Sequence, residues 1–219
     1  MNIVICRILW LLVTDNGVTQ AWAACNLNTT KNPNGTLIGS SAVVCGDHTS
    51  YDNNFIYGCD DDDSSPPVDW TKNKGRLYTW AAAMNSHGSI GRRDVSPMGA
   101  QGICPDGYII PSHYALKQLE KALGGTEAID AADLTTGYKN SGVGTKLKTG
   151  GSSELDFIRY GRRKDTGEFD RNSFTYIWSS SENSSILSFG RYTRDTAEAR
   201  VSHIKINKDY ALSVRCLKL

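Results

Sequence analysis

The C-terminal stretch, residues 176–216, constrains the fold of this chain more than any other segment. Near its end, Tyr210, Leu212 and Val214 alternate with smaller or polar residues, which is the two-residue period of a β-strand with one buried face. Shorter β-prone runs, broken by Ser, Asn and Gly, precede this strand. The stretch therefore predicts several short strands joined by turns.

Aromatic and arginine side chains are interspersed with serine and asparagine along the same stretch. This composition is typical of a recognition surface, and it also fits an ordinary antiparallel sheet with a mixed outer face. Arg191 has its own structural alternative, in which it pairs with Glu182 or with a backbone carbonyl. Under the recognition hypothesis, the expected contact residues are Ile177, Asn183, Leu187, Phe189, Arg191, Tyr192, Arg194 and His203.

Charge and cysteine spacing argue against two classes of function. Lys and Arg total 24 against 23 Asp and Glu, so the chain lacks the positive surplus of a nucleic-acid-binding protein. The six cysteines include no CxxC pair and no histidine at zinc-finger spacing, and Asp60–Asp63 lacks the pattern of a calcium loop. We therefore expect no metal and no cofactor. The wide cysteine spacing instead favours disulfides in an oxidising compartment, with Cys45–Cys59 as the preferred N-terminal pair.

The first 23 residues predict export. The apolar run 3–13 is too short for a membrane-spanning helix, but it suits the core of a signal peptide, and Ala21-Trp22-Ala23 has the small-x-small pattern of a cleavage site. Alternatively, the run is the end of a longer membrane or pilin-type N-terminal helix, which would anchor the protein. Cys25 offers lipidation as a further alternative. Each of these predicts a secreted or cell-surface protein.

Two helices are expected after the Ser64-Ser65-Pro66-Pro67 linker. The spacing of Leu77, Trp80 and Met84 predicts the first helix. The second follows a predicted strand at 108–110, with Ser112 as its N-cap and Gly124-Gly125 at its end. Its polar residues, His113, Glu120 and Lys121, are expected on the solvent side.

A series of short motifs runs through residues 75–218. They are GRLYTWAAA (75–83), GICPDGYIIPS (102–112), GTKLK (144–148), YIWSSSE (176–182), RY (191–192) and SVRCLK (213–218). In this order and spacing they resemble the Fibrobacter succinogenes major paralogous domain family, which has a C-type-lectin-like fold. Residues 1–69 lie outside the resemblance.

The resemblance implies an α+β domain in which two helices flank a small twisted antiparallel sheet and the C-terminal strand returns beside the first. It also implies a Cys104–Cys216 disulfide, which would stabilise the fold by about 4–5 kcal/mol in the chain-entropy model. We therefore divide the chain into a leader (1–23), an irregular Cys-containing segment (24–69) and a C-type-lectin-like domain (70–219).

Domains that resemble this one mostly bind ligands rather than catalyse reactions. The calcium-dependent sugar motifs of C-type lectins, Glu-Pro-Asn or Gln-Pro-Asp with Trp-Asn-Asp, are absent here. The layout also resembles proteins diversified by retroelements, because 183–190 and 192–197 consist largely of residue types that adenine mutagenesis produces. We expect an exported or surface-displayed domain that recognises a cell-surface protein or glycan through its C-terminal face, which would be hypervariable on the retroelement hypothesis.

Two other functions compete with this expectation. The chain could be a structural pilin-like or surface-layer subunit that carries a lectin-like head. It could also be a carbohydrate-active enzyme, because paired carboxylates leave no sequence motif. The four histidines lie in no Ser/His/Asp or Cys/His motif, so we expect no catalytic residues and no enzymatic activity.

Overall fold

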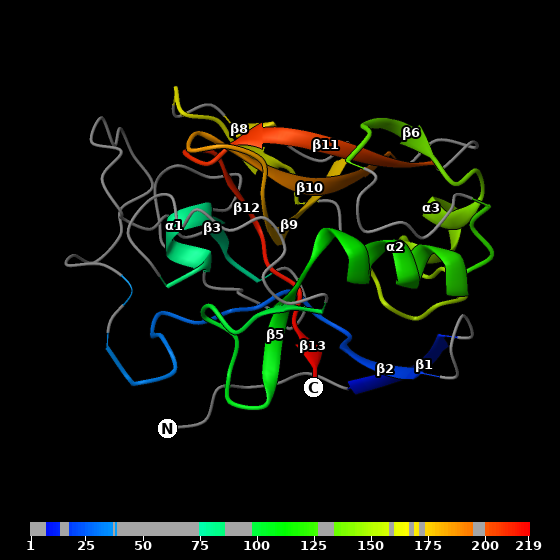
Figure 1. The fold of residues 1–219 in the computed structure, drawn as a ribbon, viewed down its shortest axis with the longest axis horizontal. Coiled ribbons are helices and arrows are strands. Elements are labelled where there is room, and N and C mark those ends of the chain that lie inside the picture. Colours follow the sequence, from blue (N-terminus) through cyan, green and yellow to red (C-terminus); the bar gives the residue numbers. More distant parts are fainter. Residues whose placement is uncertain are drawn as a thin grey trace.

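The computed structural model of the 219-residue chain describes ten ranges of residues, which form two sheets and three helices (Figure 1). This architecture confirms a mixed α+β fold. None of the helices within these ranges is long and apolar enough to cross a membrane. The described residues are 8–13, 18–36, 38, 75–85, 98–126, 134–157, 160–166, 169–170, 174–194 and 200–219.

The smaller sheet joins the two ends of the chain. Its strand order is β1-β2-β13-β5-β4, and every neighbouring pair is antiparallel. At its centre, Leu217 of β13 pairs with Trp22 of β2 on one side and with Ile109 of β5 on the other. The strands are β1 (Ile8–Val13), β2 (Val18–Ala23), β4 (Gly99–Ala100), β5 (Tyr108–Pro111) and β13 (Leu217–Lys218).

This sheet changes the expected domain boundaries. Val18–Ala23, expected in a removable leader, forms a strand between β1 and β13, and Trp22 within it is fully buried. Removing residues 1–23 would therefore remove a buried tryptophan from the core and leave one edge of β13 unpaired, with β5 on its other side. The domain includes residues well before position 70.

The larger sheet carries most of the C-terminal stretch. Its order is β6-β11-β10-β9-β12-β7-β8, with β3 also paired to β12. The strand predicted after residue 210 is confirmed at Ala211–Ser213, but both of its faces are buried rather than one, because β12 lies inside the sheet between β9 and β7. The strands are β3 (Leu77–Thr79), β6 (Gly137–Lys139), β7 (Arg162–Arg163), β8 (Phe169–Asp170), β9 (Phe174–Glu182), β10 (Leu187–Arg194), β11 (Val201–Asn207) and β12 (Ala211–Ser213).

The helices are α1 (Trp80–Ala83), α2 (His113–Ala122) and α3 (Val143–Leu147). The helix expected around Leu77–Met84 is shorter than predicted, because Leu77 lies in β3 and the Thr79 side chain caps α1. The second helix agrees with its end signals: the Ser112 hydroxyl accepts from the Ala115 N–H, and the chain leaves the helix at Gly124 with a φ of +88°.

The polar side of α2 differs from the prediction. Lys121 is exposed, but His113 and Glu120 are 1% and 2% exposed. The reason is that α2 lies between the sheets, in contact with β1 and β5 on one side and β9 on the other. A helix covered on two sides has only a narrow solvent-exposed strip, so its polar residues are not all exposed.

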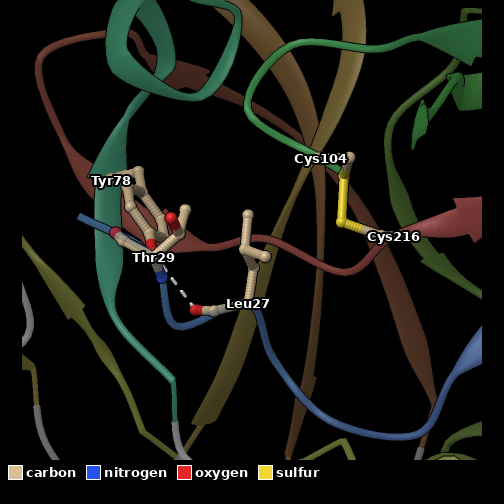
Figure 2. Close-up of a disulfide and its surroundings, with 5 residues drawn as sticks. All are labelled: Leu27, Thr29, Tyr78, Cys104 and Cys216. Atoms are coloured by element: carbon tan, nitrogen blue, oxygen red, sulfur yellow. Dashed lines mark hydrogen bonds between the residues drawn. A yellow bond between two sulfur atoms is a disulfide. The ribbon is translucent and has the colours of Figure 1, made fainter. Parts of the chain in front are cut away.

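The Cys104–Cys216 disulfide is confirmed, with a Cα–Cα distance of 5.9 Å (Figure 2). It links the loop before β5 to the chain just before β13. Cys25 is also disulfide-bonded, so lipidation of that residue is not compatible with this structure. The expected Cys45–Cys59 pair lies outside the described residues.

The segment after β2 is held against the domain by buried hydrogen bonds. The Tyr78 hydroxyl on β3 accepts from the Thr29 N–H at 2.8 Å and lies 3.3 Å from the Leu27 carbonyl oxygen (Figure 2). These hydrogen bonds show that residues 26–29 are part of the folded domain, although their composition predicted an irregular segment.

Arg215 forms a second set of hydrogen bonds that link the N- and C-terminal regions. Its guanidinium is fully buried and donates to the carbonyls of Ala23, Leu155 and Asp156 at 2.7–3.0 Å, and to the Asn26 amide oxygen at 2.8 Å. Burial lowers the pKa of Arg215 to about 9, so the group is still charged at neutral pH. Backbone oxygens accept most of the hydrogen bonds of this buried cation, so its role is structural.

Candidate functional site

The larger sheet has two faces of different character in its centre, where β9, β10 and β11 run side by side. Alternate residues of a strand point to opposite faces. In the register of these strands, Arg191 lies beside Ile177 and His203, whereas its neighbour Tyr192 lies beside Tyr176 and Ser202. The Arg191 side meets α2, which lies under these strands in Figure 1.

The face toward α2 contains a buried cluster of charged and polar groups. Glu120 of α2 accepts from three donors: Arg191 Nε at 2.5 Å, His203 Nε2 at 2.7 Å and Asn140 Nδ2 at 2.6 Å. The guanidinium of Arg191 also lies 2.8 Å from His113 Nδ1 and donates to the His113 carbonyl at 3.1 Å. All of these side chains are buried. We call Glu120, Arg191, His203, His113 and Asn140 the buried network.

The charges of the buried network follow from its hydrogen bonds. Burial alone would raise the pKa of Glu120, but the Arg191 charge and the His203 hydrogen bond lower it to about 2. Burial and the Arg191 charge lower the pKa of His203 below its usual 6.5. A guanidinium has no acceptor, so His113 Nδ1 must accept from Arg191. At neutral pH the cluster is therefore one ion pair with two neutral histidines.

Four of the eight expected contact residues belong to the interior. Ile177 and Phe189 are 0% exposed, and Arg191 and His203 are 2% and 1% exposed, so these four offer no surface to a ligand. This corrects the sequence-based prediction. All four lie on the side that faces α2, where the Phe189 ring is 4.6 Å from that of His113.

Arg191 has the structural role given as its alternative. It donates to the carbonyls of Gly190 and His113, as one form of that alternative predicted. Its acidic partner is Glu120 rather than Glu182, which is instead paired with Lys208.

The other four expected contact residues lie at opposite ends of β10. Asn183 and Leu187 are partly exposed and close the β9–β10 hairpin, where the Asn183 N–H donates to the Leu187 carbonyl at 3.0 Å. At the far end, Tyr192 is partly exposed and Arg194 is exposed. Only Tyr192 and Arg194 lie in a region where further aromatic residues gather.

A row of aromatic rings crosses the face of the sheet opposite α2. Register aligns Tyr138, Ser202, Tyr192 and Tyr176 on β6, β11, β10 and β9. Because Ser202 is small, Tyr138 and Tyr192 meet across it: their ring centroids are 5.8 Å apart, and the Tyr192 hydroxyl donates to that of Tyr138 at 2.7 Å. The Tyr192 ring is also 5.5 Å from Tyr176 and 5.7 Å from Phe174.

Two arginines are held against these rings. The Arg194 guanidinium carbon lies 5.0 Å from the Phe174 centroid and 6.0 Å from that of Tyr138. Arg162 of β7 lies 4.6 Å from the Tyr176 centroid, and its Nε is 3.4 Å from a carboxylate oxygen of Asp170. We call the set Tyr138, Phe174, Tyr176, Tyr192, Arg162 and Arg194 the aromatic face.

The aromatic face presents apolar surface and hydrogen-bond donors through Tyr138, Tyr192 and Arg194, while Tyr176 lies beneath them and is buried. Tyr138 is 47% exposed, which makes it one of three large hydrophobic side chains that are exposed among the described residues. Burial raises the pKa of Tyr176, and burial together with the hydrogen bond to Tyr138 raises that of Tyr192. These phenols are therefore protonated at neutral pH. Such a surface can stack on a ligand, donate hydrogen bonds to it and bind an anion.

Comparison with known proteins identifies the family. The Fibrobacter succinogenes major domain model matches residues 18–218. The chain belongs to this family. The match begins at the first residue of β2, so it includes most of the segment that the sequence motifs left outside the resemblance. No curated protein and no solved structure matches the chain.

Proposed function

We propose that this member of the family is an exported or surface-displayed ligand-binding domain that recognises a cell-surface protein or glycan through its aromatic face. The observation that carries the proposal is the tyrosine row with exposed Arg194 at its edge. Tyr and Arg are the residue types that contribute most to recognition surfaces, because they offer large contact area and hydrogen bonds on few rotatable bonds.

The ring contacts favour binding because they order the surface in advance. Tyr192 contacts three other rings, and its hydroxyl is bonded to Tyr138. Side chains that are already fixed lose little conformational entropy when a ligand binds. Below them, the buried network holds β10 and β11 against α2, so the strands that carry the rings rest on a well-packed base.

Two further features support the finer parts of the proposal. The pairing of β2 with β13 and the adjacent Cys104–Cys216 bridge agree with a C-type-lectin-like frame, in which the chain ends lie together. Disulfides form and persist mainly in oxidising compartments, which supports export.

The test compares the binding of three purified proteins to whole cells and to a glycan array. The first is the unmodified chain, and the second carries Tyr138→Ala, Tyr192→Ala and Arg194→Ala. The third is a matched control with three substitutions in the β9–β10 hairpin: Asn183→Ala, Ile186→Ala and Leu187→Ala. We expect binding to be lost in the second protein and retained in the third. Binding that depends on the hairpin instead would place the site there, and a chain that binds nothing would refute the proposal.

A further inference from the structure

We infer that the aromatic face takes an acidic polysaccharide, with sugar rings against the tyrosines and a carboxylate on Arg194. This inference rests on the proposed binding function and adds the chemical class of the ligand.

Arg194 is the group that selects an anion. Its side chain is exposed and is held between the rings of Phe174 and Tyr138. Within the described part of the chain, no carboxylate pairs with it, in contrast to Arg162, which lies beside Asp170. A guanidinium that contacts aromatic rings still presents N–H groups at its edge, and these bind carboxylates in bidentate geometry. Arg194 thus carries a positive charge that no carboxylate among the described residues compensates.

The shape of the aromatic face favours a glycan over a protein partner. In the aligned row Tyr138, Ser202, Tyr192 and Tyr176, the members that reach the surface are Tyr138 and Tyr192, which present rings and hydroxyls, whereas Ser202 and Tyr176 are buried beneath them. A protein interface of standard size uses about 20–30 residues on each side, more than the few exposed side chains of the aromatic face. A polysaccharide offers in each unit an apolar C–H face with hydroxyls at its edge, and a uronic acid adds a carboxylate. Neighbouring sugar units of such a ligand therefore match the adjacent rings of Tyr138 and Tyr192, with Arg194 beside them.

The experiment uses polygalacturonate and its fully methyl-esterified form as probes. The two share one sugar backbone, but the ester has no negative charge. Affinity electrophoresis or calorimetry would be run with the full chain, with Arg194→Ala and Tyr138→Ala, and with Lys205→Ala as the control. Lys205 is an exposed cation on β11 outside the aromatic face, so its substitution removes the same charge from the same sheet.

We expect binding to the acid form, at least about tenfold weaker binding to the ester, and a loss of about tenfold for Arg194→Ala. Lys205→Ala should change the affinity less than about twofold, and added salt should weaken binding to the acid form. Urea unfolding of each variant would show that the substitutions leave the fold intact.

The outcomes separate the inference from the function on which it rests. Equal affinity for polygalacturonate and its methyl ester would refute the requirement for a negative charge, whereas the proposal of a glycan-binding face would stand. Binding to poly-L-glutamate or to cell-surface proteins that requires Tyr138 and Arg194, with no binding to either polysaccharide, would overturn the glycan and leave the proposed function. Binding unchanged by both Tyr138→Ala and Arg194→Ala would refute the face itself.

Discussion

Arg191 and Arg194 lie three positions apart on β10, yet they have opposite surroundings. Arg191 is 2% exposed and forms an ion pair with Glu120, whereas Arg194 is exposed and lies against the rings of Phe174 and Tyr138. The difference arises because an odd spacing on a strand places side chains on opposite faces, and α2 covers only one of them. Residue type alone therefore does not indicate function in this sheet; the covered face is stabilising, and the open face carries the proposed binding site.

The two faces also differ in how much each contact contributes to stability. A buried charge that loses its partner destabilises the fold by about 3–5 kcal/mol. A charge at the surface contributes about 0–1 kcal/mol, because water solvates it in the folded and the unfolded state alike. Substitutions on the two faces should therefore separate stability from binding.

The largest effect is expected where β2 supports α2 from the side opposite the larger sheet. Trp22 packs in the core with Leu116 and Leu119 of α2, and Gln20 donates to Gln118 at 2.9 Å. Truncation of a buried Trp to Ala costs about 3–5 kcal/mol. Deletion of residues 1–23 also removes the bonds of β2 to β13, so we expect it to lower the free energy of unfolding by more than about 5 kcal/mol.

Urea unfolding followed by intrinsic fluorescence measures this effect. Trp22→Ala keeps every cysteine and should account for most of the loss. Tyr138→Ala on the open face should change the stability by less than about 0.5 kcal/mol. If the chain without residues 1–23 were as stable as the full chain, the first 23 residues would be a removable leader after all.

The next largest effect on stability is expected from the buried ion pair between Arg191 and Glu120. Arg191→Ala leaves Glu120 buried without its cation, so we expect a loss of about 3–5 kcal/mol. Arg194→Ala should stay within about 0.5 kcal/mol. Urea unfolding of Arg191→Ala, of Glu120→Ala and of the two combined gives a double-mutant cycle for the pair, and Arg194→Ala serves as the comparison. Similar losses for the two arginines would contradict the contrast between the faces.

Acid should weaken the buried network in a defined pH range. The pKa of Glu120 is about 2 in the folded protein against 4.5 unperturbed, so its stabilisation is present above pH 4.5 and is lost as the pH falls toward 2. The lowered pKa of His203 acts in the same direction, because protonation below pH 6.5 favours the unfolded chain. Glu120 alone should contribute a loss of about 2 kcal/mol between pH 7 and pH 3.

Unfolding curves at several pH values check this prediction. Glu120→Gln is expected to be less stable than the unmodified chain at pH 7, but its stability should decline less with acid, by about 2 kcal/mol. Arg194→Ala should follow the unmodified chain throughout. Parallel pH profiles for Glu120→Gln and the unmodified chain would mean that Glu120 does not titrate as its contacts indicate.

Local signals in the sequence were enough to predict the elements that they border. Ser112 and Gly124 mark the ends of α2, and the alternation through Leu212 marks β12. The Cys104–Cys216 bridge followed from the family resemblance, since spacing alone allows many pairings. These features depend on a few neighbouring residues or on a shared motif.

The candidate site could not be predicted in the same way because it depends on long-range packing. Tyr138 lies in a three-residue strand within a loop-rich region and meets Tyr192 across 54 positions of sequence. Glu120 looks like a solvent-exposed helical residue until α2 is seen between two sheets. A shift in the pairing of β9 and β10, between Ser188 and Gly190, further obscures which residues share a face.

The smallest effects are expected from removing a single tyrosine hydroxyl, either on the aromatic face or in the interior. Tyr192→Phe removes the bond to the exposed Tyr138 hydroxyl, and water can replace that bond, so the change in stability should be less than about 1 kcal/mol. Tyr78→Phe leaves the buried N–H of Thr29 without the acceptor that it has at 2.8 Å, so we expect a loss of about 1–3 kcal/mol. Both substitutions remove the same atom from the same residue type, and urea unfolding resolves the difference. Equal losses would mean that Tyr192 is covered in solution, and the aromatic face would then be part of the core rather than a surface for ligands.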